Sequence, residues 1–138
     1  MVRLLKVLIV EDESLDLSLL LKIIEWEKLG LTICGVARDG LEAEQMMDKY
    51  QPDIVITDIV MPYKNGTELA IYIRKHYSNV RIIFISGHQD FDYALSGIEA
   101  EIDCYLLKPI DSVKLTNTLI KISGDIIAER RRIFEKEN

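Results

Sequence analysis

Residues 53–66, which read D-I-V-I-T-D-I-V-M-P-Y-K-N-G, decide the fold of this chain. Residues 54–56 are β-branched and follow Pro52, a pattern typical of a strand that is buried on both faces. Asp58 ends this strand, at the position where open α/β sheets bind their ligands. An aspartate at that point is either a site residue or a cap of the following turn, and this stretch alone favours neither.

Length and charge limit the classes of protein to which the chain can belong. Its 138 residues, 49% hydrophobic and 29% charged, suit one compact domain. The net charge of −6 argues against a broad basic surface for nucleic acid or for an anionic membrane. The apolar run at 4–10 is short and interrupted by Lys6, so neither a signal peptide nor a membrane span is expected. Cys34 and Cys104 form no metal-ligand motif and are expected to be buried free thiols of a cytoplasmic protein.

Segments with strand spacing and segments with helix spacing alternate along the chain. Strands are expected over 4–10, 31–37, 54–58, 80–85 and 102–107. Helical spacing predicts a first helix over 14–28, ended by Gly30, and four more helices that begin near Asp39, Asn65, Asp90 and Asp111. Strict alternation requires a parallel sheet with right-handed crossovers. The expected fold is therefore α/β, a doubly wound five-stranded parallel sheet with helices on both faces.

Polar side chains follow four of the five expected strands. In a doubly wound sheet the C-terminal ends of the strands open onto one edge. The residues expected to converge there are Glu11, Asp12, Asp58, Ser86 and Lys108. Each could separately be a cap or a solvated loop residue, but three acids, a hydroxyl and a lysine at the same edge indicate a site.

The chemistry of this group of residues points to a cation and a phosphate. Three neighbouring carboxylates repel one another unless a cation lies among them. Because all the ligands are hard oxygens, Mg²⁺ is favoured, with Mn²⁺ possible. A metal that faces a lysine and a hydroxyl suits phosphate oxygens, and a carboxylate can be the nucleophile in phosphoryl transfer. Asp58 fits the nucleophile role because its strand is central in the sheet.

Four short motifs together resemble the receiver domain of two-component response regulators. They are V-E-D-E at 10–13, T-D-I-V-M-P-Y-K-N-G at 57–66, F-I-S-G at 84–87 and Y-L-L-K-P at 105–109, and the likeness extends over about 4–119. The resemblance implies a flavodoxin-like sheet of strand order 2-1-3-4-5. It also implies that Asp58 is the phosphoacceptor, that Asp12 and Asp58 bind Mg²⁺, that Glu11 acts through a metal-bound water, and that the Val60 carbonyl is a further ligand.

The same resemblance assigns roles to residues of the last two strands. Ser86 would be the switch hydroxyl that reaches the phosphoryl group, Lys108 its salt-bridge partner, and Tyr105 the aromatic residue whose rotamer reports activation. Pro109 matches a cis proline that is characteristic of the family. Glu11 and Ser86 depart from the Asp and Thr of many members, but within the range of the family.

The resemblance further implies partners and an output. A sensor histidine kinase would donate the phosphoryl group to Asp58, and the domain would catalyse its own Mg²⁺-dependent phosphorylation and dephosphorylation without being an enzyme in the usual sense. Phosphorylation would repack the fourth helix, fifth strand and fifth helix, and this face, with Leu95 and Tyr105, would form a homodimer.

The C-terminal segment suggests an output domain that this chain lacks. A receiver is expected over 1–124, and 125–138 is expected to extend the last helix or to link it to a missing domain. Residues 86–94 and 105–111 resemble receivers that precede AraC-like helix-turn-helix domains, so DNA would be bound only through such a domain and transcription is the expected output. The alternatives are a stand-alone receiver that acts as a phosphorelay intermediate or protein-binding switch, and a different enzyme or cofactor binder on the same fold.

Overall fold

A computed structural model describes residues 3–87, 95 and 97–137 of the chain. The helix expected to begin at Asp90 lies largely outside the described residues. No helix among the parts of the chain that are described is long and apolar enough to cross a membrane.

Five parallel strands form one sheet in the order β2-β1-β3-β4-β5. Their bounds are Leu5–Val10 for β1, Leu31–Ala37 for β2, Ile54–Asp58 for β3, Arg81–Ser86 for β4 and Cys104–Leu107 for β5. The expected doubly wound sheet and its strand order are confirmed. β3, which contains Asp58, is the central strand.

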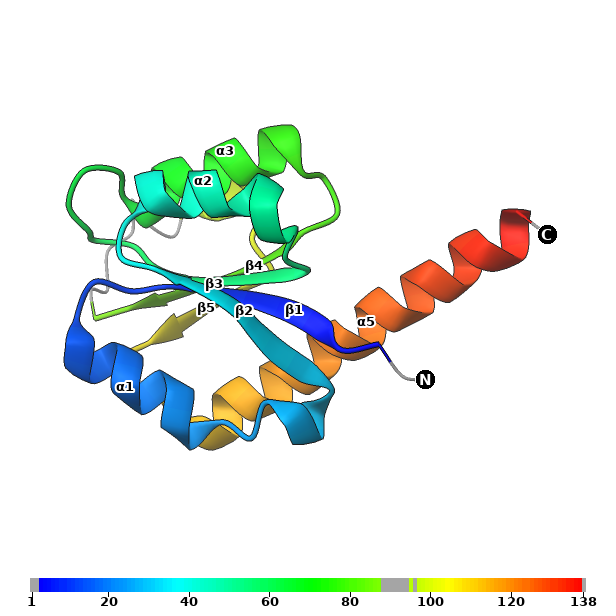
Figure 1. Cartoon of the computed structure of the whole chain (residues 1–138), viewed down its shortest axis with the longest axis horizontal. Helices are drawn as coiled ribbons and strands as arrows, with labels where there is room; N and C mark the ends of the chain where they lie inside the picture. The colour runs from blue at the N-terminus through cyan, green and yellow to red at the C-terminus, as the bar shows by residue number, and fades with distance from the viewer. Residues whose placement is uncertain (1–2, 88–94, 96, 138) are drawn as a thin grey trace.

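Helices cover both faces of this sheet (Figure 1). The described helices are α1 (Ser14–Ile23), the short 3₁₀ helix η1 (Glu27–Leu29), α2 (Gly40–Tyr50), α3 (Gly66–His76) and α5 (Ser112–Glu137). Figure 1 shows α2 and α3 on one face and α1 and α5 on the other. Along β3 the side chains alternate between these layers, because Ile54 and Ile56 pack with Leu119 of α5 whereas Val55 packs with Leu69 of α3. A strand with apolar neighbours on both sides explains the continuous apolar run at 54–56.

The first helix is shorter than its apolar spacing predicts. α1 ends at Ile23, and Ile24 has an extended backbone. The change of direction allows Ile24 and Trp26 to be buried in the core beside α5. Gly30 does end a helix, but that helix is η1, and Gly30 ends it with a φ of 77°. The expected helix over 14–28 is therefore wrong beyond residue 23, because tertiary burial overrides the local helical pattern.

Side-chain caps at three helix starts agree with the sequence. Asn65 accepts a hydrogen bond from the backbone N–H of Glu68, and the Glu68 side chain accepts one from Asn65 in return. Asp39 accepts from the backbone N–H of Glu42 at the start of α2. The Asp111 side chain accepts from the N–H groups of the first turn of α5.

The last helix continues almost to the end of the chain. α5 runs without a break from Ser112 to Glu137, so most of 125–138 is helical, and Figure 1 shows its last turns projecting beyond the sheet. The division of the chain at residue 124 stays a prediction.

Cys34 and Cys104 are free thiols, but they are half-buried and not buried as expected, because β2 and β5 are the two edge strands of the sheet.

Candidate functional site

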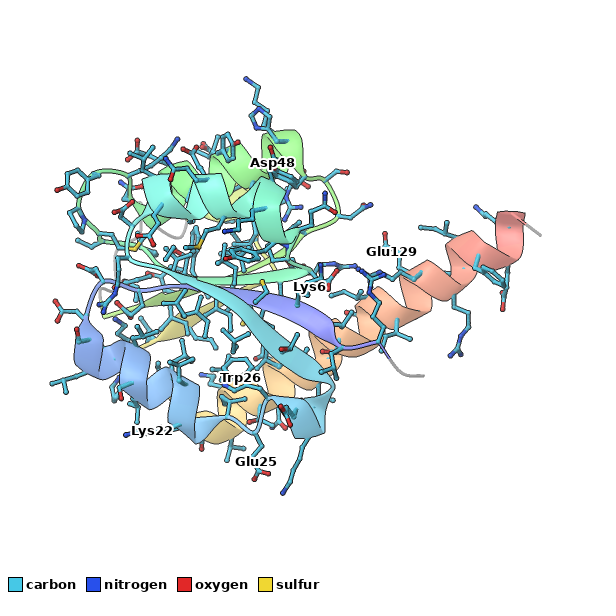
Figure 2. The ribbon with its side chains drawn as sticks, viewed as in Figure 1. Lys6, Lys22, Glu25, Trp26, Asp48 and Glu129 are labelled. Carbon is cyan, nitrogen blue, oxygen red and sulfur yellow. The ribbon has the colours of Figure 1, made fainter. Side chains whose placement is uncertain are left out.

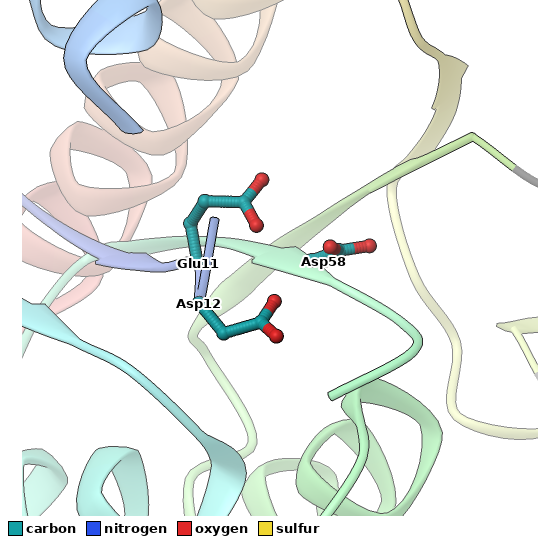
Figure 3. A group of neighbouring side chains, drawn as sticks. All are labelled: Glu11, Asp12 and Asp58. Carbon is teal, nitrogen blue, oxygen red and sulfur yellow. The ribbon is translucent and has the colours of Figure 1, made fainter. Parts of the chain in front are cut away.

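Three carboxylates meet at the C-terminal edge of the sheet. Glu11 and Asp12 follow β1, and Asp58 ends the adjacent β3. One carboxylate oxygen from each lies within 4.8 Å of the others, as Figure 3 illustrates. Glu11 and Asp58 are 3% and 7% exposed. Negative charge at this depth is unfavourable unless cations offset it, so the group could hold a metal ion.

Lys108 supplies one positive charge to this acidic group. It follows β5, and its Nζ donates to Glu11 Oε1 at 2.7 Å and to Asp58 Oδ2 at 3.2 Å. A third bond from Nζ reaches Asp16 Oδ2 at 2.8 Å. The peptide bond from Lys108 to Pro109 is cis, as the family resemblance implies. The expected convergence of Glu11, Asp58 and Lys108 is confirmed.

Asp16 is a member of the group that sequence reasoning missed. It lies in the first turn of α1, and its side chain is 39% exposed. The sequence feature that could have indicated Asp16 is its position four residues after Asp12, in the first turn of the helix that follows β1. A search for acids in the first turn after Glu11 and Asp12 would have found it.

The pKa values of Glu11 and Lys108 follow from this arrangement. Burial raises the pKa of Glu11 to about 7, and the hydrogen bond from Lys108 only partly opposes that rise. Burial would lower the pKa of Lys108, but its hydrogen bonds to Asp16 and Glu11 and the charge of Asp58 together raise it. Lys108 therefore stays charged near neutral pH, whereas Glu11 changes its protonation state in that pH range.

The donor set around Asp58 and Asp12 suits a hard cation. Asp58 Oδ1 accepts the backbone N–H of Ile59 at 2.7 Å, so Asp58 caps the following turn and also belongs to the site. Oδ1 of Asp12 is buried, and among the described residues it finds no hydrogen-bond partner. A buried carboxylate oxygen that accepts no hydrogen bond is suited to bind a hard cation such as Mg²⁺.

The remaining predicted residues lie at the same end of the sheet. Ser86 ends β4 and is fully buried, and its carbonyl accepts the N–H of Lys108 at 2.8 Å. Tyr105 on β5 is half-buried, with its ring edge-on to Phe84 at a centroid distance of 6.2 Å. Val60 lies in the loop two residues after Asp58.

Gly66 fixes the loop between β3 and α3 against the site. A Cβ atom at Gly66 would lie 2.1 Å from the carbonyl oxygen of Asp58. The N–H of Gly66 donates to the carbonyl of Ile59 at 2.7 Å. Because no side chain fits there, the glycine that ends the decisive stretch allows α3 to begin directly behind Asp58.

Comparisons with known proteins agree with this geometry. Residues 7–120 match the family model of the response regulator receiver domain. The chain is 37% identical over 127 residues to the uncharacterized transcriptional regulatory protein YesN of Bacillus subtilis, an alignment that covers 92% of this chain and 33% of YesN. The curated relatives that it matches are two to three times as long as the aligned region.

Two solved structures are similar along most of their length. The REC domain of AraT from Geobacillus stearothermophilus has a TM-score of 0.86 and 32% identity, and the alignment covers 94% of this chain and 99% of that one. The CheX–CheY–BeF3–Mg²⁺ complex from Borrelia burgdorferi has a TM-score of 0.77 and 27% identity, with 86% and 88% covered. With the family match over most of its length, this chain belongs to the response regulator receiver domains of two-component signalling.

Proposed function

We propose that the chain takes a phosphoryl group onto the side chain of Asp58 in a Mg²⁺-dependent reaction. The observation that carries the proposal is the grouping of the buried Asp58 carboxylate with Lys108 and with three further acids, Glu11, Asp12 and Asp16. Lys108 bonds to three of these four carboxylates and Asp12 adds a fourth negative charge, so the site is short of positive charge until a cation binds.

In this proposal each residue has a distinct task. An Asp58 oxygen attacks the phosphorus atom, the new O–P bond forms as the bond to the donor breaks, and the donor leaves with the electron pair. Asp12, Asp58 and the Val60 carbonyl would hold Mg²⁺, and Glu11 would support the metal indirectly. The bound cation would neutralise charge on the phosphoryl oxygens. Lys108 lies 3.2 Å from Asp58 Oδ2, where it can stabilise the same oxygens.

Ser86 and Tyr105 form the switch in this proposal. Ser86 ends the strand beside β3 and would turn towards the new phosphate, which brings three strong acceptor oxygens. Because Ser86 and Tyr105 lie on neighbouring strands, a shift of the first changes the space open to the second. Tyr105, half-buried and next to Phe84, would then reorient and alter the surface of β5.

The proposed partners follow from the family and from the lengths of its members. A sensor histidine kinase in the cytoplasm would supply the phosphoryl group. The relatives named as transcriptional regulators extend well beyond the aligned region, which supports transcription as the output and an output domain outside this chain as the part that binds DNA. Activation would pair two copies through the fourth helix, β5 and α5, near Leu95 and Tyr105.

Intact mass spectrometry tests the phosphoacceptor. The chain is incubated with acetyl phosphate and Mg²⁺, beside Asp58→Ala and the control Asp53→Ala, which removes an aspartate at the opposite end of β3. We expect one phosphoryl adduct on the native chain and on the control, none on Asp58→Ala, and none when EDTA replaces Mg²⁺. An adduct that survives the loss of Asp58 would refute the assignment.

A further inference from the structure

We propose that Asp16 is a positioning residue for Lys108: it bonds the ammonium group in the resting state and releases it to the phosphoryl group on Asp58. This role rests on the proposed function, in which Lys108 stabilises the phosphoryl oxygens. Asp16 forms no bond to phosphorus and binds no metal here. It acts only through Lys108, as a competitor for the one ammonium group of the site.

The ammonium group of Lys108 is fully occupied. Its Nζ donates to Glu11 Oε1 at 2.7 Å, to Asp16 Oδ2 at 2.8 Å and to Asp58 Oδ2 at 3.2 Å. An ammonium group has three N–H donors and no acceptor. Each donor therefore already has a carboxylate, and Asp58 receives the longest of the three bonds. Lys108 can bond further oxygens beside Asp58 only when it gives up one of its present partners.

Exposure indicates which partner is given up. The side chains of Glu11 and Asp58 are 5% and 8% exposed, whereas that of Asp16 is 39% exposed. A buried carboxylate that loses its donor costs free energy, but a carboxylate at the surface can bond to water instead. Asp16 is therefore the partner that Lys108 leaves at the smallest cost.

Phosphorylation supplies the acceptor that replaces Asp16. The attacking carboxylate of Asp58 loses its charge when it becomes an acyl phosphate, and about two negative charges then lie on the phosphoryl oxygens. These oxygens compete with Asp16 for Lys108. Removal of the Asp16 charge should therefore favour the phosphorylated state, because the ammonium group is no longer divided between the two.

The core fixes the helix that carries Asp16. Leu17 and Leu20 of α1 are buried and pack in the core on this side of the sheet. Trp26, just beyond α1, is buried in the same core, and Figure 2 shows it on the side of the sheet that α1 covers. The carboxylate of Asp16 is therefore presented to Lys108 from a fixed position, and its release requires no movement of α1.

The protonation of Lys108 supports an exchange of ion pairs. Burial would lower the pKa of Lys108, and the hydrogen bond to Asp16 is the strongest of the interactions that instead raise it. Lys108 thus keeps its proton with either partner. The exchange moves a charged group and transfers no proton.

Calorimetry with beryllofluoride, a stand-in for the phosphoryl group on Asp58, is the first test. At saturating Mg²⁺ we expect its dissociation constant to fall about fivefold in Asp16→Asn, near the upper range of what a partly exposed ion pair contributes. Glu13→Gln is the matched control, because it removes an exposed carboxylate of the same loop that forms no ion pair with Lys108 among the described residues. It should change the constant by less than about twofold.

The outcomes separate this role from the proposed function. Binding to the native chain with no change in Asp16→Asn, or with equal changes in both variants, would overturn the role of Asp16 alone. A native chain that binds no beryllofluoride would refute the proposed function itself.

Mg²⁺ binding distinguishes positioning from support of the fold. Asp16→Asn removes a negative charge near the metal site, so its dissociation constant for Mg²⁺ should rise by about twofold while that for beryllofluoride falls. Asp16→Glu keeps the charge and should return both constants to within about twofold of the native values. Weaker binding of both ligands in Asp16→Asn would show a structural defect and overturn the proposal.

Thermal unfolding in EDTA tests the pairing without metal or phosphoryl mimic. Asp16→Asn is measured in the native chain and in Lys108→Met. Without the lysine the substitution only removes repulsion among acids, so the melting temperature should change by about 3 °C more in the favourable direction than it does in the native chain. Equal changes in both backgrounds would mean that Asp16 and Lys108 are not coupled, and would refute the proposal whatever the chain binds.

Discussion

The two ends of the sheet carry similar numbers of charged residues but arrange them differently. At the C-terminal edge one ammonium group, that of Lys108, serves three carboxylates, and Asp12 adds a fourth. At the N-terminal edge the acids and bases are more nearly matched, because two arginines face three acids. Arg81 bonds to Glu129 and Asp103, and Arg130 bonds to Asp53.

Backbone hydrogen bonds sharpen the contrast. At the N-terminal edge Asp53 accepts the N–H of Lys6 at 2.7 Å, and Asp103 accepts the N–H of Ile82 at 2.8 Å. At the C-terminal edge Oδ1 of Asp12 is buried and has no hydrogen-bond donor among the residues described. The matched edge stabilises the fold, whereas the acidic edge holds a charge imbalance that a cation can relieve. Removal of an aspartate charge at Asp12 and at Asp53 should therefore have opposite effects on stability, and only substitutions at the C-terminal edge should respond to Mg²⁺.

The largest expected effect is that of Lys108→Met. Methionine keeps much of the apolar stem but removes the cation among Glu11, Asp16 and Asp58, so we expect the metal-free protein to lose about 3 kcal/mol of unfolding free energy. Urea denaturation in EDTA measures the loss. Addition of Mg²⁺ should recover part of it, and a loss that Mg²⁺ leaves unchanged would contradict a cation site at this edge.

A smaller loss is expected at the matched edge. Asp53→Asn removes the charge that faces Arg130 and weakens the acceptor of the Lys6 N–H, which should cost about 1–2 kcal/mol. The same denaturation series measures it. Mg²⁺ should leave the difference in unfolding free energy between Asp53→Asn and the native chain unchanged. A difference that depends on Mg²⁺ would contradict the contrast between the two edges.

Asp12→Asn should act in the opposite direction. The substitution removes one of the mutually repelling charges, so we expect the metal-free protein to gain about 1 kcal/mol. It should also abolish most of the stabilisation that Mg²⁺ gives the native chain. Melting curves with and without Mg²⁺ test both effects. A loss of stability in EDTA would mean that Asp12 supports the fold directly.

Stability should also depend on pH, through the raised pKa of Glu11. Because the folded pKa of Glu11 is raised from 4.5 to about 7, the folded state binds more protons than the unfolded state between these values. This contribution to stability is complete below about pH 4.5 and is lost as the pH rises towards 7. Denaturation in EDTA at several pH values should show the decline, Glu11→Gln should flatten it, and Mg²⁺ binding should strengthen over the same range because metal and proton compete.

The part of the acidic edge that the sequence does not predict depends on contacts between residues far apart in the chain. Spacing and turn residues place Glu11, Asp12, Asp58 and Lys108 at strand ends, and the doubly wound topology brings strand ends together. Asp16 joins Lys108 across 92 positions of the chain, and only the packing of α1 on the sheet reveals that contact. The early end of α1 has the same origin, because burial of Ile24 and Trp26 outweighs the helical spacing.

The sequence by itself determined the order of strands and helices, the caps at Asn65 and Asp111, and the chemical character of the site, because these depend on local periodicity and on residue type at the ends of elements. The tertiary structure decided how charge is shared: which acids bond to Lys108, why the pKa of Glu11 rises, and which acids of the opposite edge bond to Arg81 and Arg130. Burial and electrostatic interaction depend on distances between residues that are remote in the chain, and those distances exist only after the sheet and its helices have packed.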